Sequence, residues 1–284
     1  MNGNVLFEIK DLQKKFGSLT VFDGLSETIC KGDVVVIIGP SGGGKSTFIR
    51  CLNLLEQPTA GKIYFEGEDI TAKGFDVNKH RQKVGMVFQQ FNLFNNLTVL
   101  ENITISLTKV KKQSEEESKE KALKLLKRVG LEDKANAYPS QLSGGQKRRI
   151  AIAGVIAMRP QVLILDEPTA GLDPAGCRGV LENIAAYRRE TGSAVLLVTH
   201  SMDDAARIAD RLIVFHAGHV AFDGAPAEVF AHTQELLDIG LDVPQSARIA
   251  QALRDRGVAL PPSIYTLEQL TDALLAVGKE AGVC

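Results

Sequence analysis

The sequence predicts an α/β fold built around a parallel sheet, and two observations lead to this prediction. Apolar, β-branched runs that are typical of buried strands alternate with helix-compatible segments along much of the 284-residue chain. The glycine-rich segment Gly39–Thr47 (GPSGGGKST) connects one such strand to a helix-compatible segment. Strands that alternate with helices usually pair in parallel through crossover connections. We therefore expect a parallel sheet with helices packed on it.

Strands are expected where a short apolar or β-branched run is bounded by turn residues. In the first half of the chain these runs are Val5–Lys10, Val21–Ile29, Val34–Ile38, Lys62–Phe65 and Val84–Phe88. In the second half they are Val162–Leu165, Ala194–Thr199, Leu212–His216 and His219–Phe222. The last two are expected to form a hairpin, and most of the early strands are expected to form a small separate β layer.

Helices are expected where apolar positions recur with helical spacing. Ser114–Val129 has the clearest boundaries, because Ser114 and Glu117 fit a capping box and Gly130 follows the last apolar position. We interpret its charged run as a solvated helix face. The other expected helices are Ser46–Leu55, Leu97–Leu107, Ser143–Met158, Pro174–Arg189, Met202–Ile208 and a helical tail from about Gln234 that is broken at Pro244 and Pro261-Pro262.

The glycine-rich segment fits the pattern G-x-x-x-x-G-K-[ST] of a phosphate-binding loop. Glycines let backbone N–H groups point at a polyphosphate, and the following helix adds the positive end of its dipole. Lys45 would reach the β- and γ-phosphates, and the Ser46 hydroxyl would bind Mg²⁺. The alternative is a plain turn between a strand and a helix. The expected nucleotide-binding residues are Gly39, Pro40, Ser41, Gly42, Gly43, Gly44, Lys45, Ser46 and Thr47.

Two adjacent carboxylates, Asp166 and Glu167, follow the apolar strand Val162–Leu165. Asp166 can hold Mg²⁺ through water, and Glu167 can orient and polarise a water molecule for attack on a phosphoryl group. An acidic pair at the end of a strand can also occur by chance. Its place after a phosphate loop favours the catalytic interpretation.

The segment Leu142–Gln146 (LSGGQ), which we call the signature segment, lies between these motifs. With this segment the chain resembles the ATP-binding subunits of ABC transporters over at least residues 5–235. The resemblance implies a P-loop NTPase of ABC type, with a RecA-like parallel-sheet core, an antiparallel β subdomain and a helical subdomain at about residues 90–155. It places the ATPase domain at 1–235 and a C-terminal helical extension at 236–284.

The resemblance also implies roles for individual residues. Phe16 corresponds to the aromatic residue that stacks on adenine, and Gln89 to the glutamine that senses Mg²⁺ and the attacking water. Asp173 corresponds to a loop that links two subunits, and His200 to the histidine that contacts the γ-phosphate. The signature residues would contact the γ-phosphate held by the opposite subunit, so that a dimer encloses two ATP molecules. These residues are Ser143, Gly144, Gly145 and Gln146.

The implied partners are a second ATPase subunit, identical or paralogous, and integral membrane permease subunits. Phe91, Leu93 and Phe94 are either contacts for the permease or core residues. No apolar run approaches the length of about 18 to 20 residues that spans a bilayer, so we expect a soluble chain. The resemblance implies that it is held peripherally on the cytoplasmic face of the cell membrane. With 33 basic and 34 acidic residues, the chain as a whole shows no nucleic-acid footprint.

The two halves of the chain differ in composition. Residues 1–140 contain 17 lysines and 3 arginines, whereas residues 141–284 contain 2 lysines and 11 arginines. Residues 1–141 resemble the ATPases of polar amino acid importers, and residues 142–284 resemble energy-coupling-factor ATPases for metal or vitamin uptake. We therefore put forward the hypothesis of a chimera, and the substrate stays open between these classes.

Three alternatives remain at this point. The first is a soluble, non-transport ABC ATPase that acts on nucleic acid or the ribosome. The second is a chimeric nucleotide-binding module with impaired hydrolysis. The third concerns His216 and His219, which could bind a metal but more often would simply flank a turn.

The four cysteines show no metal-ligand spacing, and reduced thiols are the simplest interpretation.

Overall fold

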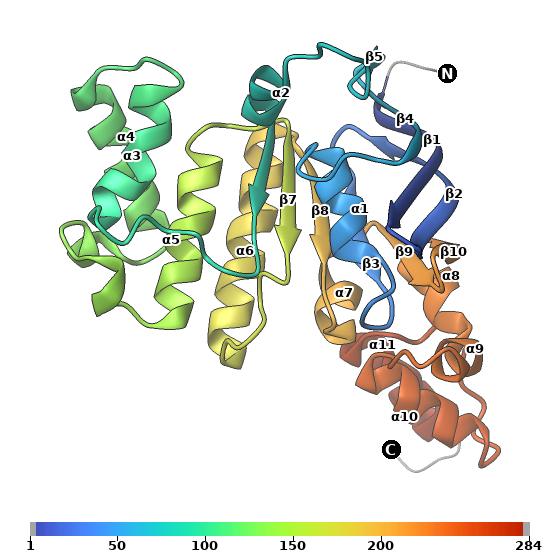
Figure 1. Ribbon diagram of the computed structural model, residues 1–284. Helices are drawn as coiled ribbons and strands as arrows, with labels where there is room; N and C mark the ends of the chain where they lie inside the picture. Colours follow the sequence, from blue (N-terminus) through green and yellow to red (C-terminus); the bar gives the residue numbers. More distant parts are fainter. Residues whose placement is uncertain (1–3, 281–284) are drawn as a thin grey trace.

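The computed structural model describes residues 4–280, and its strands form two sheets (Figure 1). The larger sheet has six strands in the order β10-β9-β3-β8-β7-β6. All neighbours in it pair in parallel except β9 and β10, which form an antiparallel hairpin. Its strands are β3 (Val34–Ile38), β6 (Val84–Val87), β7 (Val162–Asp166), β8 (Ala194–Val198), β9 (Arg211–His216) and β10 (His219–Gly224).

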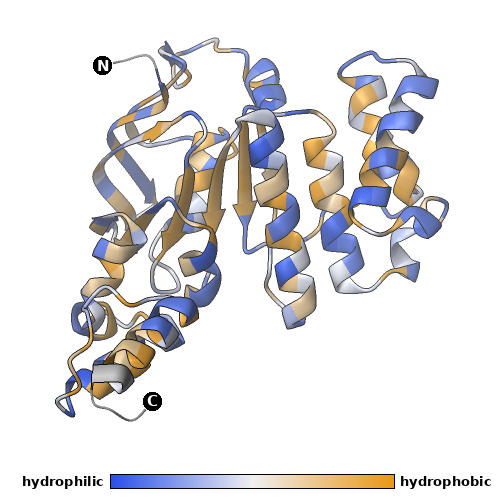
Figure 2. Cartoon of the chain, turned by 180° about the vertical axis from the view of Figure 1, so that it is seen from behind, coloured by the Kyte–Doolittle hydropathy of each residue, from blue (hydrophilic) through white to orange (hydrophobic). Residues whose placement is uncertain are grey.

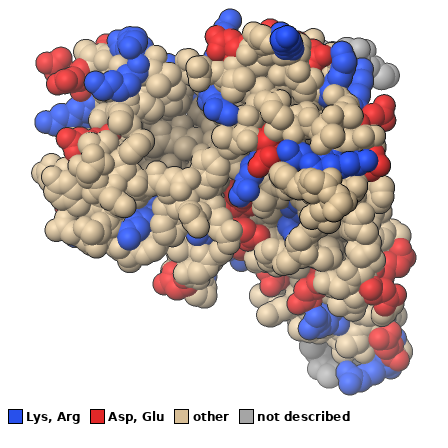
Figure 3. Space-filling view, in the orientation of Figure 1, with Lys and Arg blue, Asp and Glu red and all other residues tan. Residues whose placement is uncertain are grey.

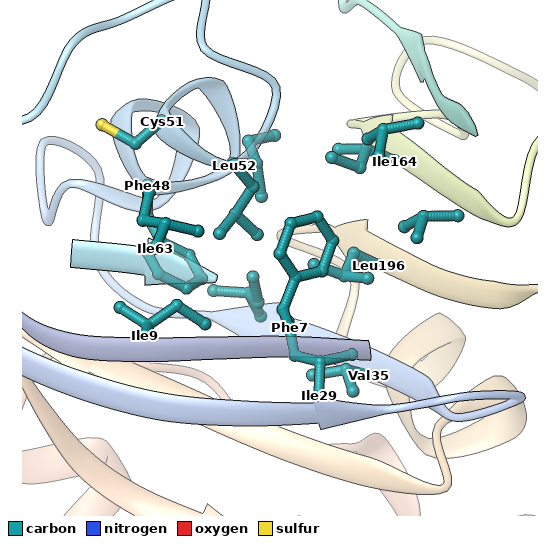
Figure 4. Close-up of a cluster of buried hydrophobic side chains, with 14 of the residues drawn as sticks. Phe7, Ile9, Ile29, Val35, Phe48, Cys51, Leu52, Ile63, Ile164 and Leu196 are labelled. Atoms are coloured by element: carbon teal, nitrogen blue, oxygen red, sulfur yellow. The ribbon is translucent and has the colours of Figure 1, made fainter. Parts of the chain in front are cut away.

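The smaller sheet is antiparallel and has the order β2-β1-β4-β5. It packs against β3 and helix α1 through a large apolar cluster, in which Phe7, Ile29 and Ile63 meet Phe48 and Leu196 (Figure 4). These contacts fix the first strands beside the helix that follows the glycine-rich loop. The strands are β1 (Val5–Phe16), β2 (Leu19–Cys30), β4 (Ala60–Phe65) and β5 (Glu68–Asp69).

Helices cover the face of the larger sheet that points away from the smaller sheet, and α3–α5 extend to one side of the larger sheet (Figure 1). Strands β3, β7 and β8 are buried along their whole length, and the strands at the centre of the molecule in Figure 2 are coloured mostly hydrophobic. The helices with eight or more residues are α1 (Lys45–Leu52), α3 (Val99–Lys109), α4 (Glu115–Arg128), α5 (Gly144–Ile156), α6 (Pro174–Thr191), α10 (Gln245–Arg254) and α11 (Leu267–Glu280). The shorter ones are α2 (Val77–Lys83), α7 (Met202–Ile208), α8 (Pro226–Ala231) and α9 (Thr233–Asp238).

The chain beyond residue 235 is helical, as expected, and begins in close contact with the sheet. Leu236, Leu241 and Ala247 belong to the same buried cluster as β3 and β8. Further along, Leu260 and Leu270 belong to a small separate cluster between α10 and α11. This C-terminal segment is thus packed against the sheet at its start and has a separate small apolar cluster toward its end.

The structure corrects several element boundaries. β1 continues to Phe16 rather than ending at Lys10, because a register shift near Asp11, which has φ of 47°, carries the strand past a charged stretch. The sequence patterns missed three short elements, β5, α2 and α8. At α4 only half of the expected capping box is present: the Ser114 hydroxyl accepts from the Glu117 N–H.

Basic and acidic side chains are interspersed over the face shown in Figure 3. No helix within residues 4–280 combines the length and apolar character needed to cross a membrane. Cys30, Cys51 and Cys177 are free thiols, whereas Cys284 lies outside the described residues.

Candidate active site

The glycine-rich loop starts at the end of β3 and requires glycine at specific points. Gly39 has φ of 154°, and a Cβ there would lie 2.3 Å from the Phe215 carbonyl oxygen on the neighbouring strand. Gly44 precedes α1 with φ of 92°, and a Cβ would approach Val21 of β2 to 2.9 Å. Only glycine allows the backbone to turn this tightly between both sheets.

Lys45 is the first residue of α1 and is 5% exposed. Its ammonium donates to the carbonyl oxygens of Gly39, at 2.7 Å, and Pro40, at 2.9 Å. Burial lowers the pKa of Lys45, while the charges of Glu167 and Asp166 act in the opposite direction. The loop thus holds a buried positive charge beside its own backbone, an arrangement suited to an anionic ligand.

Asp166 connects the glycine-rich segment to the apolar strand β7. It ends β7, is 2% exposed and accepts a hydrogen bond of 3.0 Å from the Ser46 hydroxyl. Arg50 of α1 lies 3.9 Å from its other oxygen. A hydroxyl and a carboxylate are oxygen ligands that suit Mg²⁺, which usually takes one or two carboxylates together with substrate phosphates. The donor set therefore fits this ion.

Glu167 follows directly and has a left-handed backbone, with φ of 53°. Its N–H donates to the Val198 carbonyl, and its carboxylate lies 3.3 Å from His200 Nε2. Burial raises the pKa of Glu167, and the neighbouring His200 partly opposes this rise. The left-handed conformation is unfavourable for a residue with a side chain, so the surrounding structure must hold it.

Glu167 and His200 line a cavity of about 520 Å³ together with Gln89. The structure thus brings together three residues that come from the ends of β6, β7 and β8, as expected for parallel strands. Cys177 also lines this cavity and was not anticipated. No group of three or more His, Cys, Asp or Glu side chains suited to a metal occurs in the described part of the chain, which includes His216 and His219.

Two residues assigned by resemblance are not among those that line this cavity. Phe16 ends β1, is 46% exposed, and has the Lys14 ammonium 4.4 Å from its ring centre. Asp173 is the N-cap of α6 and accepts a hydrogen bond of 2.8 Å from the Gly176 N–H.

The signature segment caps α5. The Ser143 hydroxyl accepts from the Gln146 N–H at 3.3 Å, and the Gln146 side chain accepts from the Ser143 N–H at 2.9 Å. This capping box confirms the expected helix start. Within residues 4–280 no hydrogen bond joins the segment to the phosphate loop, and the two lie on opposite sides of α6 in Figure 1.

Sequence reasoning also missed Arg148, a buried arginine of α5 that contacts the loops carrying Glu167 and Gln89. The only signal was the basic run Lys147–Arg149, which resembles an ordinary solvated helix surface.

A phosphate loop between sheet and helix, with a hydroxyl–carboxylate pair at its edge, defines a nucleotide-binding α/β protein. The chain belongs to the ABC transporter family, whose profile matches residues 22–170. It is an ATP-binding subunit with the ATPase fold and ATP-hydrolysing character of this family.

Relatives of two kinds match most of the chain. The arginine transport ATP-binding protein ArtM of Bacillus subtilis (strain 168) is 46% identical over 225 residues, which cover 79% of this chain and 93% of that protein. The energy-coupling factor transporter ATP-binding protein EcfA2 of Symbiobacterium thermophilum is 44% identical over 258 residues, covering 90% and 88%.

Solved structures of similar fold include a dimeric ABC transporter cassette, MJ0796. It aligns with a TM-score of 0.72 and 35% identity over 78% of this chain and 98% of that one. The same cassette is also known in a post-hydrolysis state with ADP and Pi. The protein cbiO1 of Clostridium perfringens, part of the complex cbiONQ, aligns with a TM-score of 0.75 and 31% identity over 88% of this chain and 99% of that one.

Proposed function

We propose that the chain powers an ABC-type importer by hydrolysing Mg²⁺-bound ATP at the interface of a dimer, on the cytoplasmic face of the membrane. The observation that carries this proposal is the joined pair of motifs: the Ser46 hydroxyl contacts Asp166, and the adjacent Glu167 opens on a cavity shared with Gln89 and His200. We further propose an ATPase domain at 1–235, with its helical subdomain at about 90–155, and an extension at 236–284.

In this proposal each residue of the site has a role at a particular part of the nucleotide. The loop N–H groups and Lys45 would bind the phosphates, and Ser46, Asp166 and Gln89 would hold Mg²⁺. Bound Mg²⁺ would neutralise charge that develops on the phosphates. Glu167 orients the attacking water, and His200 contacts the γ-phosphate from the next strand end. Phe16 offers its exposed ring to adenine.

A second subunit is proposed because the signature segment lies on the other side of α6 from the phosphate loop of its own chain (Figure 1) and cannot complete that site. Ser143 is exposed at the start of α5, where helix N–H groups favour an anion. The dimeric form of MJ0796 supports such an arrangement. Asp173, exposed at the start of α6, would lie at this interface. The partner subunit is identical or paralogous.

Permease subunits are the proposed membrane partners. Phe94 is 53% exposed and is available to such a contact, whereas Phe91 and Leu93 are half-buried against the core. The substrate remains between a polar amino acid and a metal ion or vitamin, because ArtM and EcfA2 match at nearly equal identity.

The purified chain should hydrolyse ATP in the presence of Mg²⁺, and hydrolysis should stop when EDTA removes the ion. Lys45→Met is the matched control, since it removes the phosphate-binding charge while keeping a long side chain, and it should lose most of the rate. Wild-type protein without Mg²⁺-dependent turnover, or full activity in Lys45→Met, would contradict the proposal.

A further inference from the structure

Arg148 is a cation buried among backbone carbonyl groups. The residue is 4% exposed, and it forms no ion pair with a carboxylate among the described residues. One guanidinium nitrogen donates to the carbonyl oxygens of Glu167, at 2.7 Å, and Ala170, at 2.8 Å. Burial of a guanidinium is costly unless its N–H groups are bonded. Because the buried Nε of Arg148 has no hydrogen-bond partner among the described residues, the bonds that its terminal nitrogens make to carbonyl groups are the ones that compensate this cost.

The same side chain reaches a second loop. Its other terminal nitrogen donates to the Gln89 carbonyl at 3.4 Å, and its guanidinium carbon lies 5.0 Å from the centre of the Phe91 ring. Arg148 therefore joins three segments that are distant in sequence: α5, the loop after β7 and the loop after β6. The planar fork of arginine suits contacts with several acceptors at once.

Glu167 needs such support. Its left-handed backbone is held on one side by the hydrogen bond from its N–H to Val198, and on the other by Arg148 at its carbonyl. A strained residue keeps its conformation only when neighbouring groups fix it. Without the guanidinium, the Glu167 and Ala170 carbonyls would lose these bonds and the loop could relax.

We infer that Arg148 is a positioning residue that holds the backbones of Glu167 and Gln89 and thereby ties the helix beginning at the signature segment to the hydrolytic site. The inference rests on the proposed function and adds a residue to it. Because α5 starts with the signature segment, the same side chain links the surface that would meet the partner's ATP to the water-orienting residue of its own chain.

The test compares Arg148→Met, Arg148→Lys and Arg81→Met in the full chain. Arg81 is the matched control, because its guanidinium also donates to two backbone carbonyls, those of Asn53 and Leu54, away from the cavity. Arg148→Met should lower kcat about 10- to 100-fold, since small misplacements of catalytic groups have effects of this size. Its Kd for ATP, measured by calorimetry, should change less than about 2-fold, because the phosphate loop is untouched.

Arg148→Lys should give an intermediate kcat, since an ammonium keeps the charge but lacks the planar fork. Arg81→Met should keep the wild-type kcat. Wild-type turnover in either Arg148 variant, or an equal loss in Arg81→Met, would overturn the inference. If Arg148→Met does not fold, the kcat of Arg148→Lys decides alone. A wild-type chain without turnover would instead reject the proposed function, so the two failures are distinct.

Discussion

Glu167 shows how a single residue combines unfavourable features that suit a reaction site. Its carboxyl group is nearly buried beside Asp166, its backbone is left-handed, and burial raises the pKa of its side chain. Such strain and perturbed ionisation occur together mainly at functional positions. His200 Nε2 lies 3.3 Å from this carboxylate, and both residues line the same cavity.

Glu167→Gln should bind ATP as well as the wild type does and lose most turnover, by about 100-fold or more, because the amide cannot act as a base. The substitution preserves size, so the loop should be unaltered. Nucleotide binding by calorimetry and the steady-state rate together check this prediction. Undiminished hydrolysis would reject the role assigned to Glu167.

His80 gives a pH-dependent contribution to stability. It is 2% exposed, its Nε2 donates to the Leu52 carbonyl, and Phe7, Phe65 and Phe75 surround its ring. Burial lowers the pKa of His80 below the ordinary value of 6.5. Below about pH 6.5 the His80 side chain of the unfolded chain binds a proton, whereas in the native state it stays neutral until a lower pH. The stability that His80 contributes above pH 6.5 is therefore lost as the pH falls toward its native pKa.

The free energy of unfolding in urea should accordingly decrease between pH 7.5 and pH 5.5 by up to about 1.4 kcal/mol per pH unit from this group. His80→Gln, which keeps a hydrogen-bond donor, should reduce that slope. An identical slope in the variant would show that other groups cause the loss.

At the scale of elements, α8 anchors the C-terminal extension to the sheet. Phe230 of α8 is fully buried and its ring centre lies 5.9 Å from that of Tyr265. Phe230→Ala should lower the free energy of unfolding by about 3–5 kcal/mol, because it leaves a cavity in the core. Ile249→Ala on α10, where the side chain is 49% exposed, is the control and should change it by less than about 0.5 kcal/mol. Equal changes in urea denaturation would contradict this packing.

The elements differ in how well the sequence predicts them. The strand Val34–Ile38 and the helix Met202–Ile208 match their predicted bounds, because long-range packing and local pattern agree there. The helix α2 and strand β5 were missed because they are too short to show a clear helical or strand period: β5 has two residues and α2 has seven.

The site shows the same division. The glycine loop and the acidic pair are local patterns and could be found in the sequence. Arg148 could not, because its function depends on carbonyl groups 19 and 22 residues away, and on Gln89 at 59 residues, which only folding brings together.

At the scale of the whole molecule, the two compositional halves share one core. β3 and β6 come from the lysine-rich half, and they pair with β8, β9 and β7 from the other half. Related parts of one fold can join in this way if their facing volumes are compatible. The chimera hypothesis predicts a change of codon usage near residue 141 in the source gene. Uniform codon usage across a continuous natural gene, read by long-read sequencing, would reject it.

The proposed function requires two subunits to form the site that hydrolyses ATP. The most direct test is the rate of ATP hydrolysis per subunit as the protein concentration is raised, with the association state followed by sedimentation. If two subunits are required, the rate per subunit should rise with concentration and reach a plateau as dimers form. Measurable ATP hydrolysis at a constant rate per subunit, while sedimentation shows only monomers, would contradict it.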